Sequence, residues 1–195
     1  MPKLQLQVAE MIPVTEAEGP GKRFALWVQG CPILCKACCN PQMLASQGGQ
    51  WFGLDELLDA IKQVKNQIEG ISLLGGEPFA QALGCAWLAC AVQRAGLSVM
   101  VYSGYTLLQL RHSVQPFSTA LLTYTDVLVD GPYERENPET HRRWIGSANQ
   151  DLHFLSSRYM PSDQRFFGNN TLELHWRAGD LVVNGWPQAA KAFSK

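Results

Sequence analysis

The chain has 195 residues, 46% of them hydrophobic, and a formal net charge of −1 at pH 7. This composition predicts a globular protein with a real core and excludes classes that bind nucleic acid or acidic membranes chiefly through charge. Residues 1–11 hold no apolar run typical of a signal peptide, and no later segment is long enough to cross a bilayer. We therefore expect a cytoplasmic protein with no nucleic-acid or membrane partner, and a single domain over 1–195 with a core at about 19–150 and an extension at about 151–195.

Apolar runs and helical periodicities alternate along most of the chain. Residues 23–30 are β-branched and aromatic enough to predict a buried strand, and residues 53–70 place their apolar positions at helical spacing. After them we expect a strand at 71–75, a helix at about 80–95, a strand at 97–104, a helix from Thr106 and a strand at 125–131. Such alternation is typical of right-handed β-α-β units with a parallel sheet. Because the units are too few for a closed eight-fold barrel, the predicted fold is α/β, with a partial, open β/α barrel of parallel strands.

The sequence from residue 131 onward has a different character. Residues 131–150 are polar and contain two prolines, which predicts a mobile loop over a binding site. Residues 171–185 predict a β-hairpin that turns around Ala-Gly-Asp within the C-terminal extension. On this hairpin, His175 and Trp176 are expected to pack rather than to bind a ligand.

Four of the six cysteines fall close together, at Cys31, Cys35, Cys38 and Cys39. Clustered thiols in a chain without an export signal favour metal binding or catalysis over disulfides. The C-x3-C-x2-C spacing of Cys31, Cys35 and Cys38 lets a short loop present three thiolates to three irons of a cubic 4Fe-4S cluster. Because Cys39 follows Cys38 directly, its side chain is expected to point elsewhere, and the fourth iron would be open to a small ligand.

The other two cysteines, Cys85 and Cys90, are five positions apart in the helix expected at 80–95. They would point to different sides of that helix, and we expect them to be buried as small apolar residues. Two other interpretations of the cysteine loop stay open. A zinc-binding interaction module would need a fourth ligand, and the histidines are scattered far downstream. An electron-transfer protein of the ferredoxin type would need a fourth thiolate.

Five sequence blocks in a fixed order carry a family resemblance: residues 19–42 around the cysteine loop, then 72–79, 101–106, 126–134 and 144–150. With these blocks the chain resembles the radical S-adenosylmethionine superfamily. Within it, the chain is most similar to the small activases of glycyl-radical enzymes such as anaerobic ribonucleoside-triphosphate reductase.

The resemblance implies that S-adenosylmethionine binds the open iron of a 4Fe-4S cluster and is split by one electron into methionine and a 5′-deoxyadenosyl radical. The radical would remove a hydrogen atom from a glycyl-radical enzyme partner, and a flavodoxin- or ferredoxin-type protein would supply the electron. Because these cofactors carry the chemistry, we expect no catalytic acid, base or nucleophile among the side chains. The alternative within the superfamily is an enzyme that modifies a small molecule or a peptide.

Gly75 and Gly76 end a predicted strand at the carboxyl edge of the sheet, where absent side chains let a ligand approach the backbone. The alternative is a tight turn before Pro78. The resemblance places Gly75, Gly76 and Glu77 near the methionyl amino group. Ser103 and Asp130 also end predicted strands on this rim, where each is expected to hydrogen-bond the cofactor. The resemblance further implies contacts from Ser147 and Asn149 and backbone contacts from Ala37 to Cys39. The expected cofactor-binding set is therefore Ala37, Cys38, Cys39, Asn40, Gly75, Gly76, Glu77, Ser103, Asp130, Ser147 and Asn149.

Several members of this set have an alternative role. Ser103 would otherwise cap a helix, and Ser147 and Asn149 would otherwise stabilise a turn within their own loop. Ala37 and Cys39 depart from the family pattern, which often has an aromatic residue and a histidine at these positions. Arg23 would either pair with a carboxylate near the cluster or be a surface cation, and the sequence does not decide between them.

Overall fold

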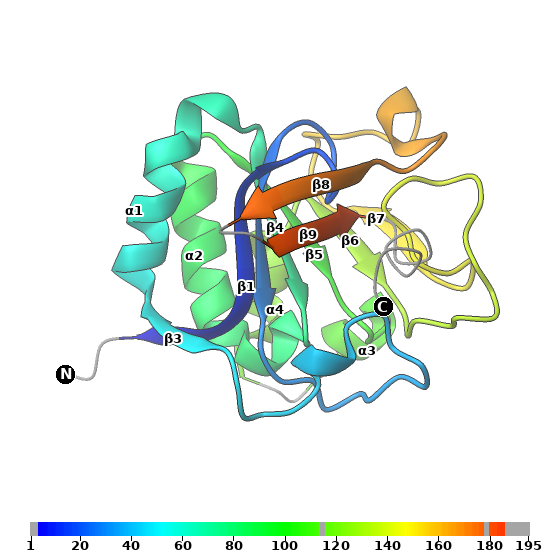
Figure 1. Ribbon diagram of the computed structural model, residues 1–195, viewed down its shortest axis with the longest axis horizontal. Helices are drawn as coiled ribbons and strands as arrows, with labels where there is room; N and C mark the ends of the chain where they lie inside the picture. The colour runs from blue at the N-terminus through cyan, green and yellow to red at the C-terminus, as the bar shows by residue number, and fades with distance from the viewer. Residues whose placement is uncertain (1–3, 114–115, 178–179, 186–195) are drawn as a thin grey trace.

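The computed structural model describes residues 4–113, 116–177 and 180–185, and a seven-stranded mixed sheet forms its centre (Figure 1). The strands are β1 (Gln5–Thr15), β2 (Arg23–Val28), β3 (Gln50–Gly53), β4 (Gly70–Gly75), β5 (Ser98–Tyr102), β6 (Val127–Asp130) and β7 (Asp151–Phe154). They lie in the order β3-β1-β2-β4-β5-β6-β7. The central strands β2, β4, β5 and β6 run parallel. At the two sides of the sheet, β1 pairs antiparallel with β2, β3 pairs antiparallel with β1, and β7 pairs antiparallel with β6.

Helices and short turns connect these strands. The α-helices are α1 (Leu54–Val64), α2 (Ala82–Arg94), α3 (Leu107–Arg111) and α4 (Ser118–Thr123), and 3₁₀ turns cover Pro41–Met43, Lys65–Gln67, Pro78–Gln81 and Gln164–Phe166. None of the described helices combines the length and the apolar character needed to cross a membrane.

The C-terminal hairpin is present, as predicted. Its strands β8 (Leu172–Arg177) and β9 (Asp180–Gly185) pair antiparallel in a sheet of their own. The expected turn residues Ala178 and Gly179 lie outside the described residues. The prediction that Trp176 packs is wrong, because its side chain is 74% exposed. The side chain of His175 also lies outside the described part of the chain.

The predicted α/β class with a largely parallel centre is confirmed, but the sheet is mixed rather than wholly parallel. β1, β3 and β7 lie outside the predicted elements. In β1, Gln5 and Gln7 alternate with the buried Leu6 and Val8, which is the period-two pattern of a strand with one buried face and could have indicated this strand. Among the described strands, the edge strands β3 and β7 do not pair with one another, so the sheet is not a closed barrel. That it forms part of a barrel stays a prediction.

Helices α1 and α2 cover one face of the sheet, and the largest core cluster lies between them and the strands (Figure 1). Side chains alternate along β2, so Phe24, Leu26 and Val28 belong to this cluster, whereas Ala25 and Trp27 belong to a cluster on the opposite face. Every residue of β2 is buried, as expected of a parallel strand covered on both faces.

α1, α2 and α3 form where the sequence predicts helices, whereas α4 is a separate short helix in place of a continuation of the stretch from Thr106. In α1, Leu54, Leu57 and Ile61 are buried on one side, and the N–H of Gly53 donates to the carboxylate of Glu56 at 2.7 Å at the helix start. In α2, Cys85 is fully buried in the core, as predicted. Cys90 is only partly buried.

Residues after β7 cover the face of the sheet that the helices leave. Met100, Val127 and Val129 on this face pack in one cluster with Tyr159 and Phe166 from the extension. Phe166 also meets the ring of Tyr159 edge to face, with ring centroids 5.8 Å apart. The extension is therefore part of the packed fold.

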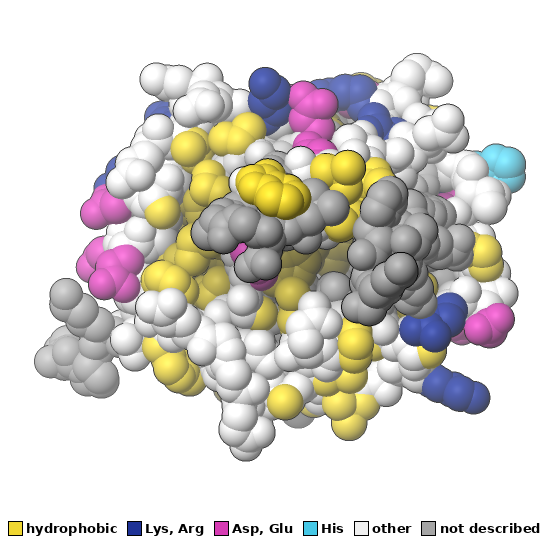
Figure 2. Space-filling view, viewed as in Figure 1, with side chains coloured by type: hydrophobic (Ala, Val, Ile, Leu, Met, Phe, Trp, Pro, Cys, Tyr) yellow, Lys and Arg dark blue, Asp and Glu magenta, His cyan; other side chains and the backbone are white. Residues whose placement is uncertain are grey.

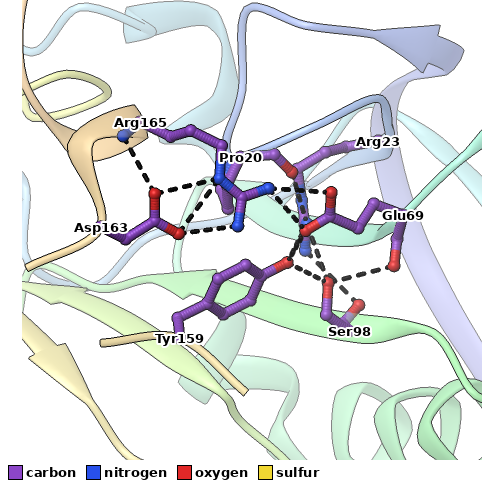
Figure 3. A network of polar contacts seen from close by, with 7 residues as sticks. All are labelled: Pro20, Arg23, Glu69, Ser98, Tyr159, Asp163 and Arg165. Atoms are coloured by element: carbon purple, nitrogen blue, oxygen red, sulfur yellow. Dashed lines mark hydrogen bonds and ion pairs between the residues drawn. The ribbon is translucent and has the colours of Figure 1, made fainter. Parts of the chain in front are cut away.

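Arg23 lies at the amino end of β2, far along the strand from the cysteine loop, and is fully buried. Its guanidinium N–H groups donate to oxygens of Pro20, Ser98 and Tyr159 (Figure 3). They also donate to the carbonyl of Ile71 and the hydroxyl of Ser72. The nearest carboxylate in this network, that of Glu69, accepts from the hydroxyl of Tyr159 at 2.5 Å. Both expectations for Arg23 are therefore wrong: it is an internal hydrogen-bond donor that joins β2, β4, β5 and the extension.

We predict that Arg23→Leu lowers the free energy of unfolding by about 3 kcal/mol, because it leaves several buried oxygens without a donor. Urea denaturation of the reduced apoprotein measures this change. The matched control is Lys22→Leu, which removes the neighbouring exposed cation and should shift stability by no more than about 0.5 kcal/mol. Equal effects of the two substitutions would contradict the role given to Arg23.

Candidate functional site

A cavity of about 740 Å³ lies at the carboxyl ends of β2, β4, β5 and β6. Its floor includes Trp27, Leu74 and Tyr102, which lie on the face of the sheet opposite α1 and α2. Ligands of open α/β sheets bind at this edge, and the volume suits a small cofactor. Nine of the predicted site residues line the cavity: Cys31, Cys35, Cys38, Cys39, Asn40, Gly75, Gly76, Glu77 and Ser103.

The cysteine loop follows β2 and borders the cavity, and backbone hydrogen bonds hold it in its folded shape. The N–H of Cys31 donates to the carbonyl of Leu44 at 3.0 Å, and the N–H of Cys38 donates to that of Cys35 at 3.2 Å. Leu34 and Ala37, each directly before a cysteine, have positive φ angles of 55° and 60°. Non-glycine residues seldom adopt this conformation, and here it turns the chain twice within the loop. The thiols of Cys31, Cys35 and Cys38 thereby come to line one cavity.

The four clustered thiols differ in their surroundings. Burial raises the pKa values of Cys31 and Cys35 above the usual thiol range. The thiol of Cys39 donates a hydrogen bond to Cys38, which lowers the pKa of Cys38 and raises that of Cys39. The N–H of Asn40 also points to the sulfur of Cys38, at 3.4 Å. Cys38 is thus the most readily ionised of these four thiols, because the hydrogen bond from Cys39 stabilises its thiolate.

Gly75 and Gly76 bring the end of β4 against the start of the cysteine loop. Gly75 has a φ of +106°, and a Cβ there would lie 2.7 Å from the Cα of Trp27. A Cβ on Gly76 would overlap the backbone carbonyl of Gly30. The N–H of Gly76 donates to Val28 at 2.8 Å, so the close approach is also hydrogen-bonded. Only glycine fits at these two positions.

Glu77 joins two loops at the cavity rim. Its buried carboxylate accepts hydrogen bonds from the N–H groups of Phe79 and Gly104, each at 2.9 Å, and from the hydroxyl of Ser103 at 3.0 Å. Burial outweighs these bonds and raises the pKa of Glu77 to about 7. The hydroxyl of Ser103 also accepts from the N–H of Tyr105 at 3.1 Å. Glu77 and Ser103 thus line the cavity and also join the turn after β4 to the loop after β5.

Four members of the expected set, Ala37, Asp130, Ser147 and Asn149, do not line the cavity. The carboxylate of Asp130 accepts from the N–H of Leu107, the first residue of α3, and lies 3.1 Å from Nε2 of His153. A contact between these four residues and the cofactor stays a prediction.

Ser147 and Asn149 make bonds within the loop at 131–150. The hydroxyl of Ser147 accepts from the N–H of Glu134 at 3.0 Å, and Nδ2 of Asn149 donates to the carbonyl of Pro132 at 2.8 Å. These bonds match the alternative role in a turn. The loop itself still borders the site, through Gly131, Tyr133 and other residues.

Sequence reasoning missed part of the cavity wall. Glu18 lines the cavity, and burial raises the pKa of its carboxyl to about 8, with a further contribution from the nearby Glu173. The hairpin residues Val183, Asn184 and Gly185 line the wall beside it. The alternation of β2 could have indicated Trp27, but nothing in the sequence indicates that a hairpin some 150 residues later lies beside Glu18.

The described cavity lining contains no histidine, and its thiols are those of Cys31, Cys35, Cys38 and Cys39. Soft thiolates without imidazole suit an iron–sulfur cluster better than a zinc site, which uses four tetrahedral ligands. Gly75 and Gly76 line the same cavity as these thiols. The residues present therefore fit a 4Fe-4S cluster with a small cofactor next to it.

Comparisons with known proteins agree with this chemistry. Residues 17–153 match the family described as 4Fe-4S single cluster domain. An anaerobic ribonucleoside-triphosphate reductase-activating protein from Vibrio cholerae is 36% identical over 72% of this chain and 93% of its own length. The protein of the same name from Haemophilus influenzae is 31% identical over the same shares.

A crystal structure of QueE from Escherichia coli aligns with 52% of this chain and 53% of its own, at 20% identity and a TM-score of 0.42. That likeness is too distant to inform fold or function. The sequence relatives and the family match are sufficient to identify the family of this chain. The chain belongs to the family of anaerobic ribonucleoside-triphosphate reductase-activating proteins.

Proposed function

We propose that this protein is a radical S-adenosylmethionine enzyme that activates a glycyl-radical enzyme, with anaerobic ribonucleotide reductase as its partner. The observation that carries the proposal is the cavity into which Cys31, Cys35 and Cys38 open beside the glycine pair Gly75 and Gly76. Membership in the family of activating proteins supports the choice of partner.

When bound, the 4Fe-4S cluster and S-adenosylmethionine supply a 5′-deoxyadenosyl radical that abstracts a hydrogen atom. In this proposal Cys31, Cys35 and Cys38 hold three irons, and Cys39 holds none. Gly75 and Gly76 place the end of β4 against the cysteine loop, so that the cofactor lies beside both segments, and their neighbour Glu77 keeps this turn fixed to the loop after β5. No side chain acts as an acid, base or nucleophile.

The walls of the cavity support this role through their chemistry. Trp27, Leu74 and Tyr102 form an apolar floor that limits water near a reactive radical. The polar rim provides hydrogen-bonding groups at Asn40 and Ser103 for the amino, carboxylate or ribose groups of the cofactor. The hydrogen donor is a backbone glycine of the partner, and a flavodoxin- or ferredoxin-type protein supplies the electron.

The first prediction concerns the cluster ligands. Cys31→Ala, Cys35→Ala and Cys38→Ala should each abolish the brown absorbance of anaerobically reconstituted protein, because each removes one of three iron ligands. Cys39→Ala is the matched control and should keep about four irons and four sulfides per chain, the content of a cubic cluster. Equal loss in all four variants, or a colourless wild-type protein that carries zinc, would contradict the assignment.

The second prediction concerns the glycine pair. Gly76→Ala should lose most of its iron as well as its affinity for S-adenosylmethionine, since the new methyl group pushes on Gly30, next to Cys31. Gly53→Ala is the control, because its Cβ would meet only the flexible carboxylate of Glu56 at 3.4 Å. Iron analysis and equilibrium dialysis measure the two losses. Full iron content in Gly76→Ala would show that the close approach does not matter.

The third prediction tests the reaction itself. Under anoxia, with dithionite and S-adenosylmethionine, the reconstituted protein should release 5′-deoxyadenosine. After addition of an anaerobic ribonucleotide reductase, electron paramagnetic resonance should detect the doublet of a glycyl radical. A reductase with alanine in place of the reactive glycine is the control. Deoxyadenosine without a glycyl radical would favour the alternative substrate, a small molecule or peptide.

A further inference from the structure

The C-terminal extension lies beside the cavity but outside the matched family region. That region ends at residue 153, and the alignment with the Vibrio cholerae protein covers 93% of that protein but only 72% of this chain. Within the extension, Asn170 and the end of β9, Val183–Gly185, line the cavity. The hairpin crosses in front of the sheet in Figure 1, over the side that α1 and α2 do not cover. Part of the cavity wall in this chain thus comes from residues outside the matched family region.

Polar contacts attach one face of the hairpin to the end of β1. The carboxylate of Glu173 accepts from the hydroxyl of Thr15 at 2.6 Å and from the N–H of Glu16 at 2.7 Å. Nδ2 of Asn184 donates to the same hydroxyl of Thr15 at 2.8 Å. Glu173 and Asn184 are directly opposite each other in the hairpin register, so both side chains lie on the same face. Thr15 and Asn184 are buried, which strengthens these bonds.

A second attachment joins the extension to the loop at 131–150, on another side of the cavity. The N–H of Trp144 donates to Oδ1 of Asn170 at 2.6 Å, and the guanidinium of Arg143 donates to the hydroxyl of Thr171 at 2.9 Å. Asn170 and Trp144 both line the cavity. The start of the hairpin therefore spans the space between the end of β1 and this loop.

The opposite face of the hairpin makes no comparable attachment among the described residues. Leu174 is 54% exposed and Trp176 is 74% exposed. Figure 2 shows hydrophobic side chains around the hairpin on the outer face of the molecule. Since Leu174 follows Glu173 directly but points away, it offers a control on the same strand.

We propose that the hairpin β8–β9 is a lid, built into the chain, that encloses the cofactor cavity and that Glu173 holds in place through Thr15 and Glu16. The lid retains S-adenosylmethionine and slows the access of oxygen and chelators to the cluster. This rests on the proposed function only in that the cavity holds these two groups. Glu173 acts as a positioning residue, because its carboxylate binds Thr15 and Glu16 and Glu173 is not among the residues that line the cavity.

The test compares Glu173→Ala with Leu174→Ala in anaerobically reconstituted protein. Loss of two charge-assisted hydrogen bonds should weaken S-adenosylmethionine binding and speed the bleaching of the cluster in air, each by roughly three- to tenfold. Leu174→Ala should match the wild type in both measurements. Iron content before exposure should be equal in all three proteins, since none of the changes touches a cluster ligand.

Thr15→Val provides a second, nearly isosteric test. It removes the hydroxyl that both Glu173 and Asn184 bind, and it should reproduce the faster bleaching. Hydrogen exchange at the β9 amides shows whether the hairpin is released in either variant. If the hairpin is released in these variants but bleaching and affinity are unchanged, the proposal is overturned. It is also overturned if the hairpin stays attached in both Glu173→Ala and Thr15→Val, because Glu173 would then not hold it in place.

These outcomes differ from a failure of the proposed function. If the wild-type protein binds no cluster or no S-adenosylmethionine, the function is wrong. If the wild-type protein binds both and the variants behave like it, only the lid is wrong.

Discussion

The close backbone contact between Gly76 and Gly30 is the constraint on which the site depends. The parallel pairing of β2 with β4 sets Val28 opposite Gly75, so the two strands end at the same level. The chain after β2 becomes the cysteine loop, and the chain after β4 becomes the glycine turn. Because Glu77 donates its N–H to Gly30 at 2.9 Å, the two segments cannot move independently. Three thiols and a glycine-lined space are thereby fixed to each other through the backbone.

Glu77 extends this coupling to the next strand. Its carboxylate connects the glycine turn with Ser103 and Gly104, which follow β5. Such a buried, fully bonded carboxylate is costly to leave unpaired, so the loops after β4 and β5 hold each other in place. The loop geometry that would orient a small ligand is therefore set before any ligand binds. Preorganisation of this kind suits a reaction in which the protein contributes position and shielding.

The parts of the fold that the sequence predicts are those with strong local patterns. α1, α2 and the central strands follow from periodicity, and the grouping of Cys31, Cys35 and Cys38 at one cavity follows from their spacing. Ser147 and Asn149 show the limit of such patterns: a motif indicates that residues matter near a site, but not whether a side chain faces the ligand or bonds within its own loop. The alternation at the start of β1 is a local strand pattern, but its antiparallel pairing with β2 and β3 is not recorded in the sequence. The place of Glu18 in the cavity wall could not be predicted, because its neighbours there come from a hairpin that is distant in the sequence.

The second face of the sheet explains why the extension has a place to pack. α1 and α2 cover one face, and the loop after β2, through Met43, packs on only part of the other. Met100 and Val129 on the remaining part would be exposed apolar surface without a further layer. Phe166 supplies that layer, and the chain beyond it arrives at the cavity edge. Once a segment must cover the sheet beside an open cavity, its continuation is well placed to cover the cavity too, so packing and shielding arise from the same stretch of chain.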